Sequence, residues 1–224
     1  MLGRLEFAPG SRGRGTVEDL FGLSVFAVRT DPSGWLGTRR LERAGAALRR
    51  CGAVRVLLPK EFEAWDLLTR FGLRTVDPAP FLRAQAPTLA LAGLRRRDLD
   101  PERATVAISG MRVDGDMFRT AAVLCPKVRR LVISARGGEH LARRLRDEFG
   151  MPVLPPGEPA QLELCFHPGG QTGTEARLEL YGREANLDGG RLFHPGLGPQ
   201  GDALPLLCAL WERGKLDVQG LKFT

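Results

Sequence analysis

The fold is decided by residues 104–154, which read ATVAISGMRVDGDMFRTAAVLCPKVRRLVISARGGEHLARRLRDEFGMPVL. Short apolar runs alternate here with helical patterns, in the order 105–108, 117–125, 131–134, 139–149 and 152–154. The apolar runs have the length and β-branched content of buried strands, whereas the longer segments repeat apolar residues every three or four positions. Strands that alternate with helices in this way predict parallel pairing through right-handed crossovers.

The segments before this stretch repeat the alternation less regularly. Strand-like runs and amphipathic helical patterns follow one another at 25–28, 36–51, 54–58, 61–71, 73–76 and 79–97. Pro87 predicts a kink or a late start in the last of these helices. Residues 8–16, rich in glycine and proline, predict a flexible loop. The polar residues from Asp98 to Arg103 indicate an internal boundary, so we expect a smaller α/β unit at 18–98 and a Rossmann-like unit at 99–224.

The predicted fold is therefore α/β, a mostly parallel, three-layer, Rossmann-like architecture in two linked halves. Residues 161–182 depart from the pattern, because apolar and polar residues alternate at 161–167 and again at 177–181. Such alternation predicts a solvated face. We expect an altered or antiparallel edge here, with two strands near a sheet edge or a hairpin around the glycine-rich turn 168–176. A last helix is predicted from Asp202 or Ala203, and a final strand within 216–223.

The composition excludes several classes of protein. The 224 residues are 43% hydrophobic and 26% charged, which is ordinary for a globular domain. No apolar run approaches the ~20 residues that span a bilayer, and the N-terminus has no leader pattern, so we expect no membrane association and a cytoplasmic location. Four widely spaced cysteines predict buried thiols in a reducing compartment: Cys51, Cys125, Cys165 and Cys208.

The positive charge is uneven along the chain. The net charge is +7, and residues 1–100 hold 17 basic and 11 acidic residues. Much of this excess lies in the helical pattern at 36–51, which carries Arg39, Arg40, Arg43, Arg49 and Arg50. The helix is either a solvated face or a surface for an anionic or assembly partner. A single tyrosine, without interleaved aromatic residues, disfavours binding of nucleic acid by base stacking.

Candidate ligand-binding residues follow the two clearest strands. Ligands of open parallel sheets bind beyond the carboxyl ends of the strands, where the strand order reverses. The residues at these two ends are Ser109, Gly110, Arg112 and Gly115 after the first strand, and Ser134, Arg136, Gly137 and Gly138 after the second. Asp114 and Asp116 in the first loop are a candidate carboxylate pair or ordinary turn formers.

Residues 104–154 resemble the Rossmann-type nucleotide-binding domain of the shikimate dehydrogenase and glutamyl-tRNA reductase group. The resemblance lies in the spacing of strand, glycine turn and helix, followed by 131–136, 141–145 and 148–150. It implies that Arg136 would pair with the 2′-phosphate of NADP. The glycine fingerprint is degenerate, because Arg112 stands where the second glycine would be, and Asp114 and Asp116 would repel phosphate.

These observations favour a cytoplasmic Rossmann-like protein that binds a small molecule or a protein partner without hydride transfer, its cofactor unidentified. An NADP-dependent oxidoreductase is one alternative. A structural or assembly protein that uses the arginine-rich helix 36–51, as in a homo-oligomer, is another. We expect no metal site, because the histidines form no ligand pattern; only Cys165, His167 and His194 could form a cluster.

Overall fold

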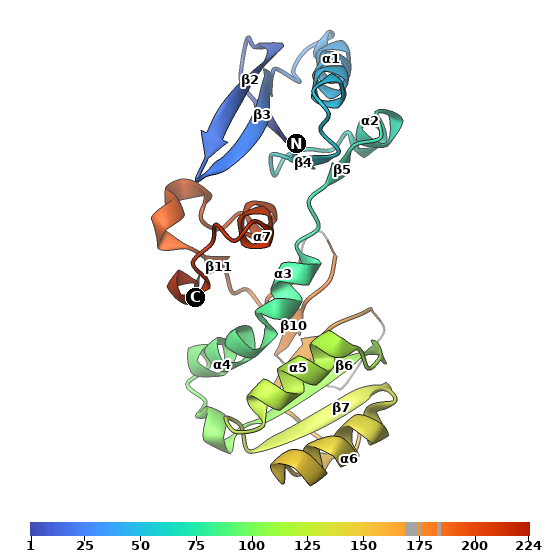
Figure 1. Ribbon diagram of the computed structural model, residues 1–224, viewed down its shortest axis with the longest axis vertical. Coiled ribbons are helices and arrows are strands. Elements are labelled where there is room, and N and C mark those ends of the chain that lie inside the picture. The colour runs from blue at the N-terminus through green and yellow to red at the C-terminus, as the bar shows by residue number, and fades with distance from the viewer. Residues whose placement is uncertain (169–173, 175, 183–184) are drawn as a thin grey trace. The chain divides into compact units, whose positions relative to one another are not determined.

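The structure is a computed structural model of the chain, and it describes residues 1–168, 174, 176–182 and 185–224 (Figure 1). The chain forms two compact units. The first unit comprises Met1–Val76 and Pro199–Val218, and the second comprises Asp77–Gly198 and Gln219–Thr224. This division differs from the boundary expected near Asp98, because two helices before that point pack on the second sheet and a late helix joins the first unit. The apolar face of a helix can be buried against either sheet, so the order of elements along the chain does not show to which unit a helix belongs.

The sheet of the first unit has the strand order β2-β3-β1-β4-β5. Its central strand β1 pairs in parallel with β3 and β4, whereas β2 is antiparallel to β3 at the edge. The strands are β1 (Leu2–Phe7), β2 (Arg12–Leu20), β3 (Leu23–Thr30), β4 (Arg55–Leu57) and β5 (Arg74–Thr75). The expected strands and helices from residue 23 to residue 76 are all present, although most are shorter or longer at their ends.

The loop expected at residues 8–16 is wrong for most of its length, because strand β2 begins at Arg12. Gly15 is needed there for packing: a Cβ atom on it would lie 2.1 Å from the Phe26 ring. A tight turn at Phe21 and Gly22, both with positive φ (53° and 81°), then joins β2 to β3. The glycines of this segment thus serve a sheet edge, where small residues are common.

Helices cover both faces of the first sheet. Helices α1 (Gly37–Arg50) and α2 (Trp65–Arg70) lie on one face, where a Cβ atom on Gly3 would come within 2.8 Å of Leu48 Cδ2. The core on this side contains Leu5, Val28, Ala44, Leu48, Val56, Phe62 and Leu68. Helix α7 (Leu204–Glu212) faces the other side, where Glu212 forms an ion pair with Arg55 of β4. The first unit therefore has three layers.

The sheet of the second unit is parallel throughout, with the order β10-β9-β6-β7-β8. Its strands are β6 (Thr105–Arg112), β7 (Arg130–Arg136), β8 (Val153–Leu154), β9 (Leu162–Cys165) and β10 (Arg177–Glu179). Helices α4 (Ala86–Arg96), α5 (Gly115–Leu124) and α6 (Gly138–Phe149) contact one another in a row along one face (Figure 1). The α/β class and the mostly parallel pairing are thus as expected.

The expected kink near Pro87 is confirmed. The predicted helix 79–97 is divided at Gln85 into α3 (Ala79–Ala84) and α4, and Pro87 lies in the first turn of α4. In the described part of the chain, short 3-10 helices connect other elements at Pro101–Arg103, Pro195–Gln200 and Val218–Gly220. The predicted final strand is reduced to β12 (Lys222–Phe223), which pairs antiparallel with β11 (Leu192–Phe193).

Strands β9 and β10 lie at one edge of the second sheet, as the sequence predicts. The hairpin alternative is wrong, because β10 runs parallel to β9, with Leu178 beside Leu164. Most of the expected glycine-rich turn, residues 169–173 and 175, lies outside the described residues. Antiparallel pairing at this edge is limited, among the described residues, to an isolated bridge between Leu178 and Leu187.

Every helix within the described ranges is too short or too polar to cross a lipid bilayer. All four cysteines are free thiols. Cys125, Cys165 and Cys208 are buried, as expected, and Cys51 is half-buried at the end of α1.

Candidate functional site

The two predicted strand ends lie side by side. Ser109 of β6 pairs in register with Ser134 of β7, and after a bulge Arg112 pairs with Arg136. The backbone N–H of Val113 then donates to the Arg136 carbonyl at 3.0 Å. Strand β6 is therefore longer than predicted, and it places the first group of candidate residues directly against the second.

The loop after β6 ends in a capped helix. Asp114 is the N-cap of α5, and its Oδ1 accepts a hydrogen bond from the Met117 N–H at 2.9 Å. Gly115 opens the helix, and Asp116 forms an ion pair with Arg119. Because this carboxylate already accepts a hydrogen bond from a free N–H group of the helix, the N-terminus of α5 has less capacity to bind a second anion. This is the position at which the resemblance would place a pyrophosphate.

Gly110 allows a side chain to approach from the neighbouring strand. A Cβ atom on Gly110 would lie 2.9 Å from His167 Nδ1 and 3.4 Å from Met117 Sδ. His167 follows β9, and its Nε2 lies 3.6 Å from Asp114 Oδ2. Its Nδ1 is buried and has no hydrogen-bond partner in the described part of the chain. Gly110 therefore makes room for an imidazole ring, whereas a Rossmann fingerprint would use it to admit pyrophosphate.

The opposite face of the sheet carries a buried polar network. A Cβ atom on Gly93 of α4 would contact Leu162 and Leu178, so the alternate residues Glu163 and Arg177 face away from that helix. Ser109 Oγ donates to Glu163 Oε1, and Arg177 Nη1 lies 3.9 Å from Glu163 Oε2. The Glu163 carboxylate, only 1% exposed, thus has both a hydroxyl donor and a cation beside it.

Three further side chains complete this network: Cys165, Glu179 and Tyr181. Arg177 Nη2 donates to Cys165 Sγ at 3.0 Å, and its Nε lies 3.4 Å from Glu179 Oε1. Burial alone would lower the pKa of Arg177, but Cys165, Glu163 and Tyr181 together outweigh burial and raise that pKa. Burial also raises the pKa of Tyr181, whose hydroxyl donates to Glu179 at 3.2 Å. Arg177 is therefore held firmly in its charged form.

The solvated strand face predicted for residues 161–167 is thus wrong. Glu163 and Cys165 are buried, because Ser109 and Arg177 satisfy the carboxylate and the thiol. Alternation of polar and apolar residues does not distinguish water from such partners. Only the acid at Glu163 and the arginine at Arg177, in two strands expected to lie near each other, gave a signal for this pairing.

The ends of β6 and β7 carry two unpaired cations. The side chains of Arg112 and Arg136 are exposed, and among the described residues neither has an ion-pair partner. Because they are register partners, both lie on one face of the sheet. We call this pair the arginine edge. Gly137, with φ 83°, is the N-cap of α6 and supplies no side-chain hydrogen bond, and Gly138 packs closely on Ile133.

The histidine grouping considered from the sequence is not formed. His194 Nδ1 accepts a hydrogen bond from the backbone N–H of Gly196, two residues further along the chain. Within the described ranges, His167 and Cys165 are not joined by a third ligand into a group that would hold a metal ion.

Comparisons with known proteins found distant structural similarities alone. No protein-family model and no curated protein matches the chain. L-tryptophan dehydrogenase from Nostoc punctiforme aligns with a TM-score of 0.33 and 14% identity, over 73% of this chain and 55% of that chain. Shikimate 5-dehydrogenase from Listeria monocytogenes, solved with shikimate and NAD, aligns with a TM-score of 0.29 and 11% identity, over 73% and 67%. The aligned part thus spans about half of the tryptophan dehydrogenase.

Proposed function

We propose that the second unit binds a small anionic ligand at the carboxyl ends of β6 and β7, without transferring hydride. The arginine edge carries this proposal: Arg112 and Arg136 are exposed, adjacent and without counter-ions among the described residues. Paired guanidinium groups bind carboxylate and phosphate through charge-assisted hydrogen bonds. Their place at the carboxyl ends of parallel strands is the usual ligand position in open α/β sheets.

The neighbouring residues favour a ligand smaller than a dinucleotide. Asp114 caps α5 and Asp116 adds a second carboxylate, so a pyrophosphate at this helix would meet negative charge. Strand β6 also continues to Arg112, where a Rossmann fingerprint would have a tight glycine turn. A phosphate monoester or a carboxylate at the arginine edge avoids both obstacles. The ligand class is therefore a small organic acid or phosphate.

A thermal-shift panel tests the proposal. AMP, glycerol 3-phosphate and citrate are compared with NADP, NAD, ATP and S-adenosylmethionine. We expect a monophosphate or a carboxylate to raise the melting temperature, and Arg112→Ala or Arg136→Ala to weaken its binding about tenfold. Arg129→Ala is the matched control, because this exposed arginine precedes β7 at the opposite end of the strand. Absence of a shift with every anion would reject the proposal.

An NADP-dependent oxidoreductase is the second candidate, and the position of Arg136 at the end of β7 favours it. It predicts that NADP stabilises the protein more than NAD does. It also predicts that Arg136→Ala removes the difference and that NADPH is oxidised by some carbonyl substrate. Stabilisation by small anions together with equal, weak effects of both dinucleotides would favour the first candidate instead.

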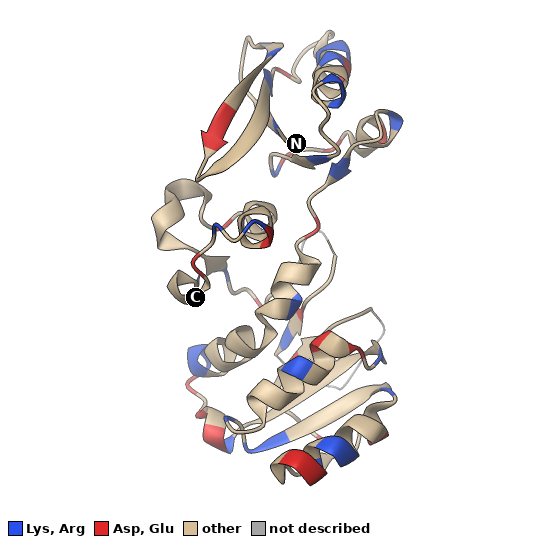
Figure 2. Cartoon of the chain, viewed as in Figure 1, with Lys and Arg blue, Asp and Glu red and all other residues tan. Residues whose placement is uncertain are grey.

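An assembly function through α1 is the third candidate. Trp35, immediately before this helix, is 89% exposed. Arg39, Arg43, Arg49 and Arg50 are exposed and have no ion-pair partner in the described part of the chain, and Figure 2 shows how basic residues dominate α1. An exposed tryptophan beside arginines is typical of an interaction surface. Size-exclusion chromatography tests it: a stable oligomer that Trp35→Ala dissociates would support assembly.

A further inference from the structure

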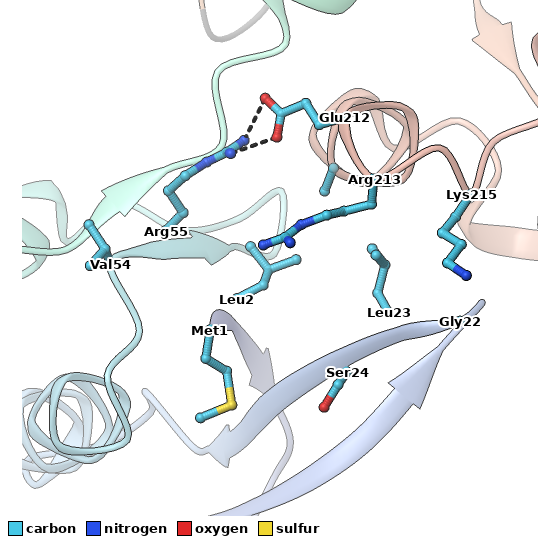
Figure 3. A pocket seen from close by; sticks show the side chains of 11 residues that line it. Met1, Leu2, Gly22, Leu23, Ser24, Val54, Arg55, Glu212, Arg213 and Lys215 are labelled. Atoms are coloured by element: carbon cyan, nitrogen blue, oxygen red, sulfur yellow. Dashed lines mark hydrogen bonds and ion pairs between the residues drawn. The ribbon is translucent and has the colours of Figure 1, made fainter.

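The first unit contains a pocket of its own, of about 560 Å³. It lies between the sheet and the end of α7 (Figure 3), and all of its lining residues belong to the first unit. Strand β1 contributes Leu2, the turn before β3 contributes Gly22, and β4 contributes Arg55. A pocket of this volume is within the range that accommodates small molecules.

The end of α7 brings two cations to this pocket. Arg213 and Lys215 follow the helix, and their side chains extend toward the sheet (Figure 3). Within the described ranges, neither side chain has a hydrogen-bond or ion-pair partner. The Lys215 stem passes the turn, because a Cβ atom on Gly22 would lie 3.7 Å from Lys215 Cδ. The guanidinium group of Arg213 and the ammonium group of Lys215 are thus available to a ligand.

The third cation of the pocket is already neutralised. Arg55 binds Glu212 through two hydrogen bonds, of 2.6 and 3.1 Å. This bidentate pair holds the side chain of Arg55 against α7 and leaves the pocket with a surplus of two positive charges, from Arg213 and Lys215. An anion therefore meets an attractive field without having to displace an existing partner.

Most of the remaining lining of the pocket is apolar, apart from Ser24. Leu2 is half-buried and Val54 is 49% exposed, whereas Leu23 and Ala209 are buried. Apolar surface beside unpaired cations suits a molecule that has an apolar body and one anionic group. An ion such as inorganic phosphate would use the cations alone and leave the apolar wall without a partner.

We propose that this pocket binds a small amphiphilic organic anion, whose charged group is held by Arg213 and Lys215 and whose apolar body contacts Leu2 and Val54. The pocket is formed by other residues, in another unit, than the arginine edge. The inference therefore goes beyond the function proposed above and does not depend on it.

Phenyl phosphate and inorganic phosphate are the probes, measured by isothermal titration calorimetry. The titrations use the full chain carrying Arg112→Ala and Arg136→Ala, so that the arginine edge does not contribute. We expect phenyl phosphate to bind at least about fivefold more tightly than inorganic phosphate, because its ring removes apolar surface from water. Adding Arg213→Ala or Lys215→Ala is expected to weaken phenyl phosphate binding about tenfold.

A matched control removes two cations elsewhere in the same unit. Arg39→Ala with Arg43→Ala on α1 lowers the net charge by two, more than either single substitution in the pocket does, and phenyl phosphate binding should still be unchanged. All four arginine and lysine side chains are exposed, so circular dichroism should show every variant folded. Equal affinity for the two probes, or equal weakening by the α1 control, would overturn the proposal. Loss of binding on Arg112→Ala and Arg136→Ala alone would also overturn it and would assign the ligand to the arginine edge.

Discussion

At the scale of single residues, the buried Glu163 carboxylate depends most on its partners. It is 1% exposed and lies beside Ser109 Oγ and the Arg177 guanidinium. Arg177→Met leaves the carboxylate buried without its cation, and removing one partner of a buried ion pair costs about 3 kcal/mol of unfolding free energy. Urea denaturation measures this loss. The double variant Glu163→Gln, Arg177→Met should recover part of it, and no recovery would show that Arg177 acts through other contacts.

Asp31 makes the stability of the first unit depend on pH in the acidic range. Hydrogen bonds from the Ser33 side chain, then from the Gly10 and Ser33 N–H groups, lower the pKa of Asp31 to about 2, from an ordinary value of about 3.9. The folded state therefore favours the ionised carboxylate. Its contribution to stability is complete above about pH 4 and is lost as the pH falls through about 2.

Asp31→Asn is expected to remove this contribution. The variant should be less stable than the wild type at neutral pH, and its unfolding free energy should fall less between about pH 4 and pH 2. Urea denaturation across this range measures both. Asp66→Asn, an exposed acid in α2, is the control. Equal acid sensitivity of the Asp31→Asn protein and the wild type would contradict the assignment.

At the scale of elements, the N-cap residue of α5 stabilises the helix and also weakens the binding of anions near it. Asp114→Ala removes the hydrogen bond to the Met117 N–H and should cost about 1 kcal/mol of unfolding free energy. It also removes a carboxylate near the arginine edge, so affinity for a small anion should rise. The substitution should therefore lower both the melting temperature and the dissociation constant for a small anion. A rise in the dissociation constant would instead place Asp114 among the ligand contacts.

The sequence predicts elements well where the chain alternates regularly. The strands and helices between residues 104 and 154 all occur, because each apolar segment packs on its own neighbours along the chain. Strand β1 was not predicted, since its six residues give little periodicity. Strand β2 was not predicted either, because its glycines read as a loop, although Gly15 packs under Phe26. The direction of β10 depends on the path of the intervening connection, which local pattern does not determine.

The sequence predicted only part of the arrangement of residues at the candidate site. Ser109, Gly110, Arg112 and Arg136 were placed correctly at adjacent strand ends, because parallel topology fixes where strands terminate. The Glu163 network and the contact of His167 with Gly110 were not anticipated. The Ser109–Glu163 hydrogen bond and the His167–Gly110 contact join residues more than fifty positions apart. Their pairing follows from the strand order β9-β6, which a single sequence does not reveal.

At the scale of the whole molecule, the chain returns to its first unit after completing most of the second. Helix α7 begins at Leu204, yet it belongs with Met1–Val76. The ion pair between Arg55 and Glu212 links β4 to this helix across 157 positions of sequence. The two units are therefore not independent in sequence, and a truncation before residue 199 would remove part of the first unit.

A double-mutant cycle tests this return of the chain. Arg55→Ala, Glu212→Ala and their combination are compared by urea denaturation, and we expect a coupling energy of roughly 0.5 to 1 kcal/mol, because the pair is bidentate but partly solvated. The side chains are 40% and 31% exposed, which excludes the larger values of buried pairs. Hydrogen exchange should also quicken in α7 and stay unchanged in β6 and β7 when Arg55 is replaced. Zero coupling together with unchanged exchange in α7 would mean that this helix is not anchored to β4, and the proposed anion pocket would then lose its wall.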